Sequence, residues 1–122
     1  MPTDTMNARF GLKQSTIDKI NGVFSAHPRI ERVIIYGSRA KGNYRNSSDI
    51  DITIEGEAIT LSELLKVETE LDDLLLPYTL DLSLLHLIDD QDLLNHIRRV
   101  GSVFYERQAI SADSGDNLTG NS

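Results

Sequence analysis

Apolar and polar residues repeat along the chain with two periods, and each change of period marks a predicted element. Helical spacing of apolar residues predicts helices over 15–25 and 61–76, and a third helix whose apolar stripe is Leu93, Leu94, Ile97 and Val100. Alternation or short β-branched runs predict strands over 32–36, 49–55, 78–85 and 103–105. The predicted order is α-β-β-α-β-α-β. It indicates an α/β (α+β) domain with a four-stranded mixed sheet flanked by about three helices.

Residues that begin or end helices stand at the edges of these segments. Thr60 is followed three residues later by Glu63, which is the spacing of a capping box at the start of the second helix. The other signals are prolines that end helices, aspartates that cap them and a glycine that closes them. In chain order they are Pro28, Pro77, Asp89 or Asp90, and Gly101.

Length and composition favour one domain in a reducing compartment. The 122 residues suit a single core, and the absence of cysteine excludes disulfides and thiolate metal sites. With no long apolar run and no signal-peptide pattern, we expect a cytoplasmic protein that neither spans nor binds a membrane. We predict a flexible N-terminus over 1–12, a domain over 13–107 and a disordered acidic tail over 108–122.

The net charge of −7 bears on the choice of ligand. Proteins that bind a polynucleotide backbone usually present a basic face, so direct nucleic-acid binding is not expected. Acidity also disfavours a triphosphate ligand, unless divalent cations lie between the carboxylates and the phosphates.

Aspartates gather on the polar faces of two predicted strands. Asp49 and Asp51 share a face because side chains alternate along a strand, and Asp81 joins them if the third strand pairs beside the second. Carboxylates that converge favour hard cations, Mg²⁺ first and Mn²⁺ second, and two such ions suit phosphoryl-type displacement. The alternative is a solvent-exposed polar strand face. Three histidines show no metal-ligand spacing, and surface or capping positions are favoured for them: His27, His86 and His96.

A candidate phosphate-binding turn follows the first strand. Gly37 allows the backbone to approach a ligand, and Ser38 is placed to cap the next short helix and to meet phosphate oxygens. Arg39 and Lys41 either contact phosphate or are solvated cations that offset the nearby aspartates.

These residues form a pattern with a known resemblance. Gly37-Ser38, then ten residues, then Asp49-Ile50-Asp51 resembles the signature of the polymerase-β-type nucleotidyltransferase superfamily. The fuller strings, Gly37 to Gly42 and Ser48 to Asp51, are similar to its minimal branch, the minimal nucleotidyltransferases (MNT). Such proteins are commonly paired with a HEPN-domain toxin and act as its antitoxin. The resemblance spans about residues 30–106 and implies a polymerase-β-like nucleotidyltransferase fold.

The resemblance implies a role for each matched residue. Gly37 and Ser38 would hold the β- and γ-phosphates of ATP or another nucleoside triphosphate, and Asp49 and Asp51 would bind two Mg²⁺ ions, with Mn²⁺ as a substitute. Asp81 would complete one metal site and orient or deprotonate the attacking hydroxyl. That hydroxyl attacks the α-phosphorus and pyrophosphate leaves.

The leading hypothesis is an antitoxin enzyme that transfers AMP to a tyrosine of a HEPN toxin, with which it forms a hetero-oligomer. One alternative is a non-catalytic antitoxin that neutralises its toxin by binding alone. Another is a small-molecule nucleotidyltransferase, which is disfavoured because the chain has no room for an acceptor-binding domain. The combination of Gly37-Ser38 with Asp49 and Asp51 argues against an antitoxin that acts by binding alone, since such a protein has no need of these residues.

Overall fold

The computed structural model describes residues 9–45 and 47–107, and the elements within them follow the predicted order. The predicted flexible residues 1–8 and the predicted tail 108–122 lie outside the described residues. The elements are α2 (Gln14–Ser25), β1 (Arg32–Tyr36), α3 (Gly37–Lys41), β2 (Ile50–Glu55), α4 (Leu61–Asp72), β3 (Leu80–Leu84), the 3-10 turn η1 (Leu85–Leu87), α5 (Gln91–Val100) and β4 (Ser102–Glu106).

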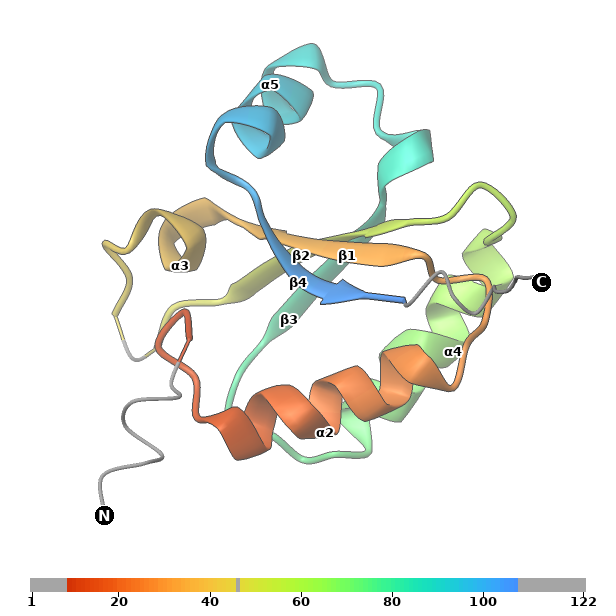
Figure 1. Ribbon diagram of the computed structural model, residues 1–122, viewed down its shortest axis with the longest axis horizontal. Helices are drawn as coiled ribbons and strands as arrows, with labels where there is room; N and C mark the ends of the chain where they lie inside the picture. Colours follow the sequence, from red (N-terminus) through yellow and green to blue (C-terminus); the bar gives the residue numbers. More distant parts are fainter. Residues whose placement is uncertain (1–8, 46, 108–122) are drawn as a thin grey trace, which may run out of the picture.

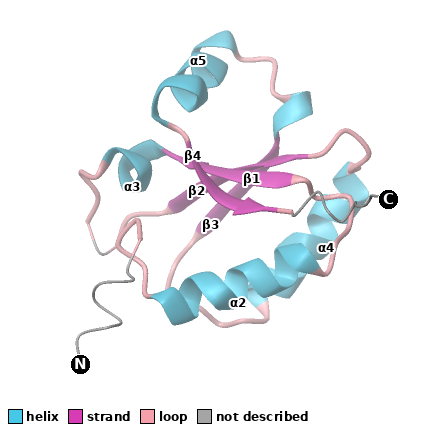
Figure 2. Cartoon of the chain, in the orientation of Figure 1, coloured by secondary structure: helices cyan, strands magenta, loops and turns pink. Residues whose placement is uncertain are grey.

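The four strands form one mixed sheet, as predicted, and their order in it is β3-β2-β1-β4. β1 runs antiparallel to β2 and to β4, whereas β2 and β3 are parallel and are connected through α4. Helices α2 and α4 lie together on one side of the sheet, and α5 lies on the other (Figure 1). Figure 2 shows the same arrangement by type of element. About three helices were expected. The described residues contain four α-helices, because the stretch after β1 forms the short α3.

The core lies between the sheet and the pair α2 and α4. Ile50, Ile52 and Ile54 of β2 are fully buried there, as their alternation predicts. Burying each such side chain contributes about 1.5–3 kcal/mol to folding. No helix in the part of the chain that the structure describes is long and apolar enough to cross a membrane.

The N-terminal segment contributes to this core earlier than the sequence indicated. Leu12 was assigned to the flexible lead-in, but its side chain is fully buried. Arg9 and Leu12 exchange two backbone hydrogen bonds across a tight turn at Phe10 and Gly11, where both residues have positive φ. The segment was misassigned because a single buried leucine before a helix leaves no periodic signal.

The predicted caps of α4 and α5 are confirmed. The hydroxyl of Thr60 accepts a hydrogen bond from the backbone N–H of Glu63, 3.2 Å away. Of the two candidate aspartates, Asp90 caps α5 and accepts from the N–H groups of Asp92 and Leu93 at 3.0 and 3.3 Å. These bonds satisfy donors that have no partner within the helix itself.

Two helix ends differ from the prediction. α4 ends at Asp72 rather than near residue 76, because Leu75 takes φ 56° and turns the chain back. That turn leaves Leu75 exposed while its neighbours Leu74 and Leu76 pack against the core. Gly101 ends α5 as predicted, but in an extended conformation rather than the left-handed one. A side chain there would collide with the carbonyl of Ile97.

Candidate functional site

The sheet brings together the aspartates that the sequence placed on polar strand faces. Asp51 on β2 lies directly opposite Asp81 on the parallel strand β3, and Asp49 immediately precedes β2. On the other side of β2, Tyr36 at the end of β1 lies opposite Asp51. Asp51 is half-buried, whereas Asp49 and Asp81 are exposed. The strand pairing on which the prediction for Asp81 depended is therefore present.

The neighbouring carboxylates act electrostatically on Asp51. Burial raises the pKa of Asp51 above the ordinary carboxyl value, and the negative charges of Asp81 and Asp49 raise it further. His96 opposes this shift and lowers the pKa of Asp51. A cation bound at this place would relieve the repulsion that disfavours the ionised form of Asp51.

Gly37 brings the backbone into direct contact with this carboxylate. It is the first residue of α3 and has φ 76°, a conformation that favours glycine. A Cβ atom at Gly37 would overlap the Oδ2 atom of Asp51. The end of β1 and the metal-binding candidate on β2 are thus packed so closely that only glycine fits between them.

Ser38 does not cap α3. The residue that precedes the helix is Tyr36, and no side chain caps that end, so Ser38 lies inside the first turn. The prediction of a cap was wrong because the helix begins at Gly37, two residues earlier than a cap at Ser38 would require. Ser38 remains half-buried beside Gly37.

Arg39 is bound within the fold. Its side chain is 2% exposed. Its Nε donates to the carbonyl of Ser48 at 3.1 Å, and a terminal nitrogen donates to the carbonyl of Phe10 at 2.8 Å. The guanidinium also lies over the rings of Tyr44 and Tyr78, 5.3 and 5.1 Å from their centroids. These contacts hold the Arg39 side chain within the fold, whereas Lys41 is exposed at the end of α3. Phosphate contact by Arg39 or Lys41 stays a prediction.

The sequence favoured a surface or capping position for His96, which is half-buried in the structure. Its ring meets the ring of Tyr36 edge to face, with centroids 6.1 Å apart. His96 thereby joins α5 to the strand end that carries Gly37. The available signal was its spacing, because His96 stands three residues after Leu93 and so shares the apolar stripe that faces the sheet.

Residues 18–110 match the sequence model of the family described as "Polymerase beta, Nucleotidyltransferase". The chain belongs to this nucleotidyltransferase family. No protein of curated function matches the sequence.

Three solved complexes contain chains with the nucleotidyltransferase fold seen here. A toxin–antitoxin complex with AMP-PNP superposes with a TM-score of 0.60 at 23% identity, over 75% of this chain and 74% of that one. A tri-AMPylated Shewanella oneidensis HEPN toxin in complex with MNT antitoxin gives a TM-score of 0.56 at 21% identity, over 80% of this chain and 76% of that one. An MntA–HepT toxin–antitoxin complex gives 0.57 at 18%, over 78% and 74%. At these identities the likeness shows the fold alone.

Members of the nucleotidyltransferase family generally use divalent metals, and the residues present fit such ions by donor type. Asp49, Asp51 and Asp81 offer carboxylate oxygens, the ligands that Mg²⁺ and Mn²⁺ prefer, and their mutual repulsion acts on Asp51. The described residues contain no group of three His, Cys, Asp or Glu side chains that is already arranged to hold an ion.

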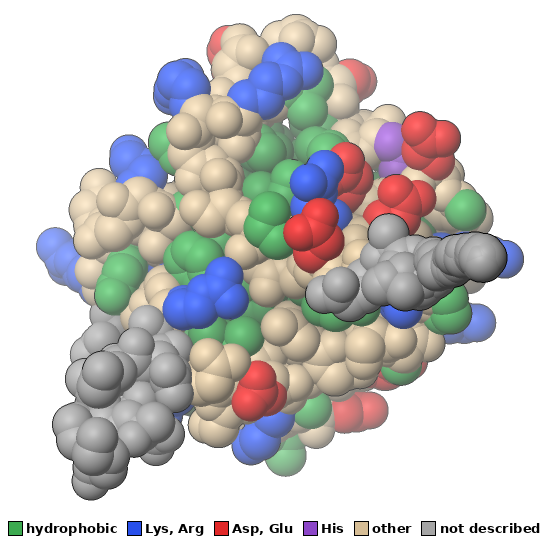
Figure 3. Space-filling view, viewed as in Figure 1, with side chains coloured by type: hydrophobic (Ala, Val, Ile, Leu, Met, Phe, Trp, Pro, Cys, Tyr) green, Lys and Arg blue, Asp and Glu red, His purple; other side chains and the backbone are tan. Residues whose placement is uncertain are grey.

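A groove of about 500 Å³ lies apart from these carboxylates. Figure 3 shows apolar side chains around a hollow beneath α5. Its lining includes apolar Ile34, Leu94 and Ile97, with Arg32 and Arg98 among its charged residues. None of the predicted site residues lines this groove, so it does not alter the placement of the site.

Proposed function

We propose that this nucleotidyltransferase is an antitoxin enzyme that transfers AMP from ATP to a hydroxyl, that of a tyrosine, on a cognate HEPN-domain toxin. The observation that carries the proposal is the contact of Gly37 with Asp51, which is itself paired with Asp81 across the parallel strands. This contact places a candidate phosphate-binding turn beside candidate metal ligands.

The structural neighbours support the choice of substrate and partner. One neighbour was solved with AMP-PNP, and another contains an AMPylated HEPN toxin bound to an MNT antitoxin.

The residues take separate roles in this proposal. Gly37 and Ser38 hold the β- and γ-phosphates, with the exposed Lys41 as a further phosphate contact. Asp49 and Asp51 hold divalent cations, and Asp81 completes one of these sites and orients or deprotonates the acceptor hydroxyl. When bound, Mg²⁺ supplies charge neutralisation on the triphosphate.

The transfer itself is a single displacement. The acceptor oxygen forms a bond to the α-phosphorus, the bond from that phosphorus to the pyrophosphate oxygen breaks, and the acceptor proton passes to Asp81 or to water. The protein contributes by positioning the reactants and by neutralising charge. Displacing one of the carboxylates should therefore lower the rate of transfer strongly.

An assay in cells separates this enzyme from an antitoxin that acts by binding alone. The toxin is expressed with the wild-type protein, with Asp49→Ala or with the matched control Asp89→Ala, another exposed aspartate away from the sheet. We expect Asp49→Ala to fold and to bind the toxin but to give no protection, while Asp89→Ala protects fully. Full protection by Asp49→Ala at normal expression, with the toxin unmodified, would establish neutralisation by binding instead.

A further inference from the structure

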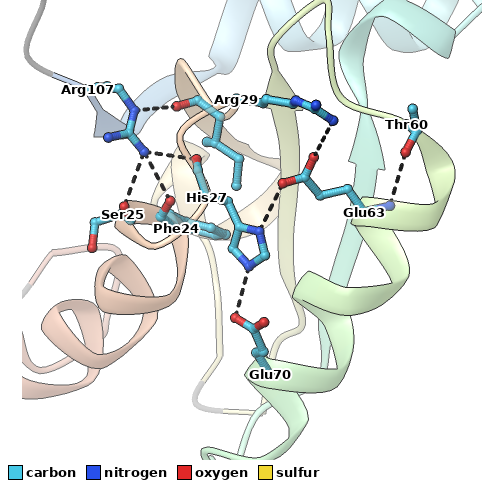
Figure 4. A network of polar contacts seen from close by, with 9 residues as sticks. Phe24, Ser25, His27, Arg29, Thr60, Glu63, Glu70 and Arg107 are labelled. Carbon is cyan, nitrogen blue, oxygen red and sulfur yellow. Dashed lines mark hydrogen bonds and ion pairs between the residues drawn. The ribbon is translucent and has the colours of Figure 1, made fainter.

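His27 connects the end of α2 to α4 through both nitrogens of its ring. Nδ1 lies 3.0 Å from Oε2 of Glu63, and Nε2 lies 2.9 Å from Oε1 of Glu70. The two glutamates are about two helical turns apart on α4, so one imidazole spans the gap between them (Figure 4). A neutral imidazole carries a single N–H, whereas carboxylates only accept. Both hydrogen bonds therefore require the doubly protonated, positively charged ring.

The basic residues near His27 do not displace its ring from either glutamate. The guanidinium of Arg29 lies 3.6 Å from the second oxygen of Glu63, and Lys66 lines the same surface hollow as His27. From the end of β4, Arg107 donates to the backbone carbonyl of His27 at 2.9 Å and leaves the ring to the glutamates.

Burial makes the two contacts unequal. The side chains of His27 and Glu63 are 11% and 17% exposed, whereas that of Glu70 is 45% exposed. Water can replace Glu70 more readily than it can replace Glu63. When the ring loses its proton, the loss of the Glu63 contact therefore costs more free energy than the loss of the Glu70 contact.

We propose that His27, Glu63 and Glu70 form a pH-sensitive latch between the α2–β1 connection and α4, closed when His27 is protonated and released when it is neutral. α4 is the crossover between β2 and β3, the strands that carry Asp51 and Asp81. Release of the latch loosens α4 locally before it affects the sheet.

The sign of the pH dependence follows from the contacts. Burial alone lowers the pKa of His27, but hydrogen bonds to Glu70 and Glu63 and the charges of both outweigh it. The pKa of His27 in the folded protein is therefore above its ordinary value of about 6.5. The latch makes its full contribution to the stability of the folded protein when the pH is below that ordinary pKa value. This contribution is lost as the pH rises through the raised pKa of His27.

The test compares the thermal stability of the wild type, His27→Gln and the matched control His86→Gln at about pH 6 and about pH 8.5. His86 is exposed and lies outside the latch. We expect the wild type to melt about 5 °C above His27→Gln at the lower pH, with most of that difference gone at the higher pH. His86→Gln should follow the wild type. A difference between the wild type and His27→Gln that is the same at both values would overturn the latch.

A second measurement decides the matter even if His27→Gln does not fold. Glu70→Gln retains the histidine and removes one charged partner at a partly exposed site. Nuclear magnetic resonance titration of the His27 ring should give a midpoint above about 6.5 in the wild type and a lower one in Glu70→Gln. A wild-type midpoint at or below the ordinary value, or no change in Glu70→Gln, would contradict the proposal.

Discussion

At the scale of single residues, Gly37 has the most specific requirement in the site. Its positive φ disfavours any other residue, and its hydrogen atoms face the Asp51 carboxylate, which leaves no space for a methyl group. Gly42, at the other end of α3, also has a positive φ of 91° but has open space around it. A comparison of substitutions at the two glycines therefore distinguishes the effect of backbone strain, which both share, from the effect of contact with the Asp51 carboxylate, which only Gly37 has.

This difference predicts the outcome of two alanine substitutions. Gly37→Ala and Gly42→Ala should each cost about 1–2 kcal/mol of stability, because both force alanine into the left-handed region. Only Gly37→Ala displaces Asp51, so its transfer activity should fall about 100-fold further than that of Gly42→Ala. Stability is measured by chemical denaturation and activity by AMP transfer to the partner. Equal activity in the two folded variants would remove Gly37 from the site.

The site residues differ in how far the sequence could predict them. Asp49 and Asp51 follow from the period of two along a strand, and Asp81 follows once β3 is paired beside β2. The burial of Arg39 could not be predicted, because it depends on carbonyls and rings brought close only by the fold. The same is true of His27, whose partners lie on a different helix.

At the scale of elements, Arg39 contacts three segments around α3: the turn before α2, the α3–β2 loop and the residues before β3. It bonds to the turn before α2 through Phe10 and to the loop before β2 through Ser48. It also lies over Tyr44 in the loop after α3 and Tyr78 before β3. The orientation of the helix that begins at Gly37 thus depends on one buried guanidinium.

A conservative substitution tests this structural role. Arg39→Lys cannot reproduce the planar fork or its stacking, and it leaves buried carbonyls without a donor, so we expect a loss of about 1–3 kcal/mol in the free energy of unfolding. Lys41→Ala, on the exposed end of the same helix, should change that free energy by less than about 0.5 kcal/mol. If Arg39→Lys keeps full stability but binds ATP more weakly, Arg39 is a phosphate ligand after all.

The order of elements was predictable because most of them bury an apolar face, which leaves a periodic pattern. Their boundaries were less so. The sequence extended α4 towards Pro77, since a run of leucines continues past Asp72, but the chain reverses at Leu75 to reach β3. At Leu12 the predicted domain began too late. Leu12 is buried because of a tight turn, and such a turn leaves no periodic pattern in the sequence.

At the scale of the whole molecule, the net charge of −7 opposes the binding of a triphosphate, and the three aspartates add to this opposition locally. Under the proposed function, binding of ATP would depend on divalent cations between the carboxylates and the phosphates, and a partner protein would supply the acceptor hydroxyl. The transfer would then need this protein, a metal and the partner together.

That transfer can be measured directly with the purified protein, a HEPN-domain partner, Mg²⁺ and α-labelled ATP. Mass spectrometry should show one or more AMP units added to a tyrosine of the partner, with release of pyrophosphate. Removal of Mg²⁺ by chelation, or the substitution Asp49→Ala, should lower the rate at least about 100-fold, since charge neutralisation worth several kcal/mol is lost. A partner that stays unmodified with the wild-type protein, or that is labelled equally by Asp49→Ala, would contradict the account.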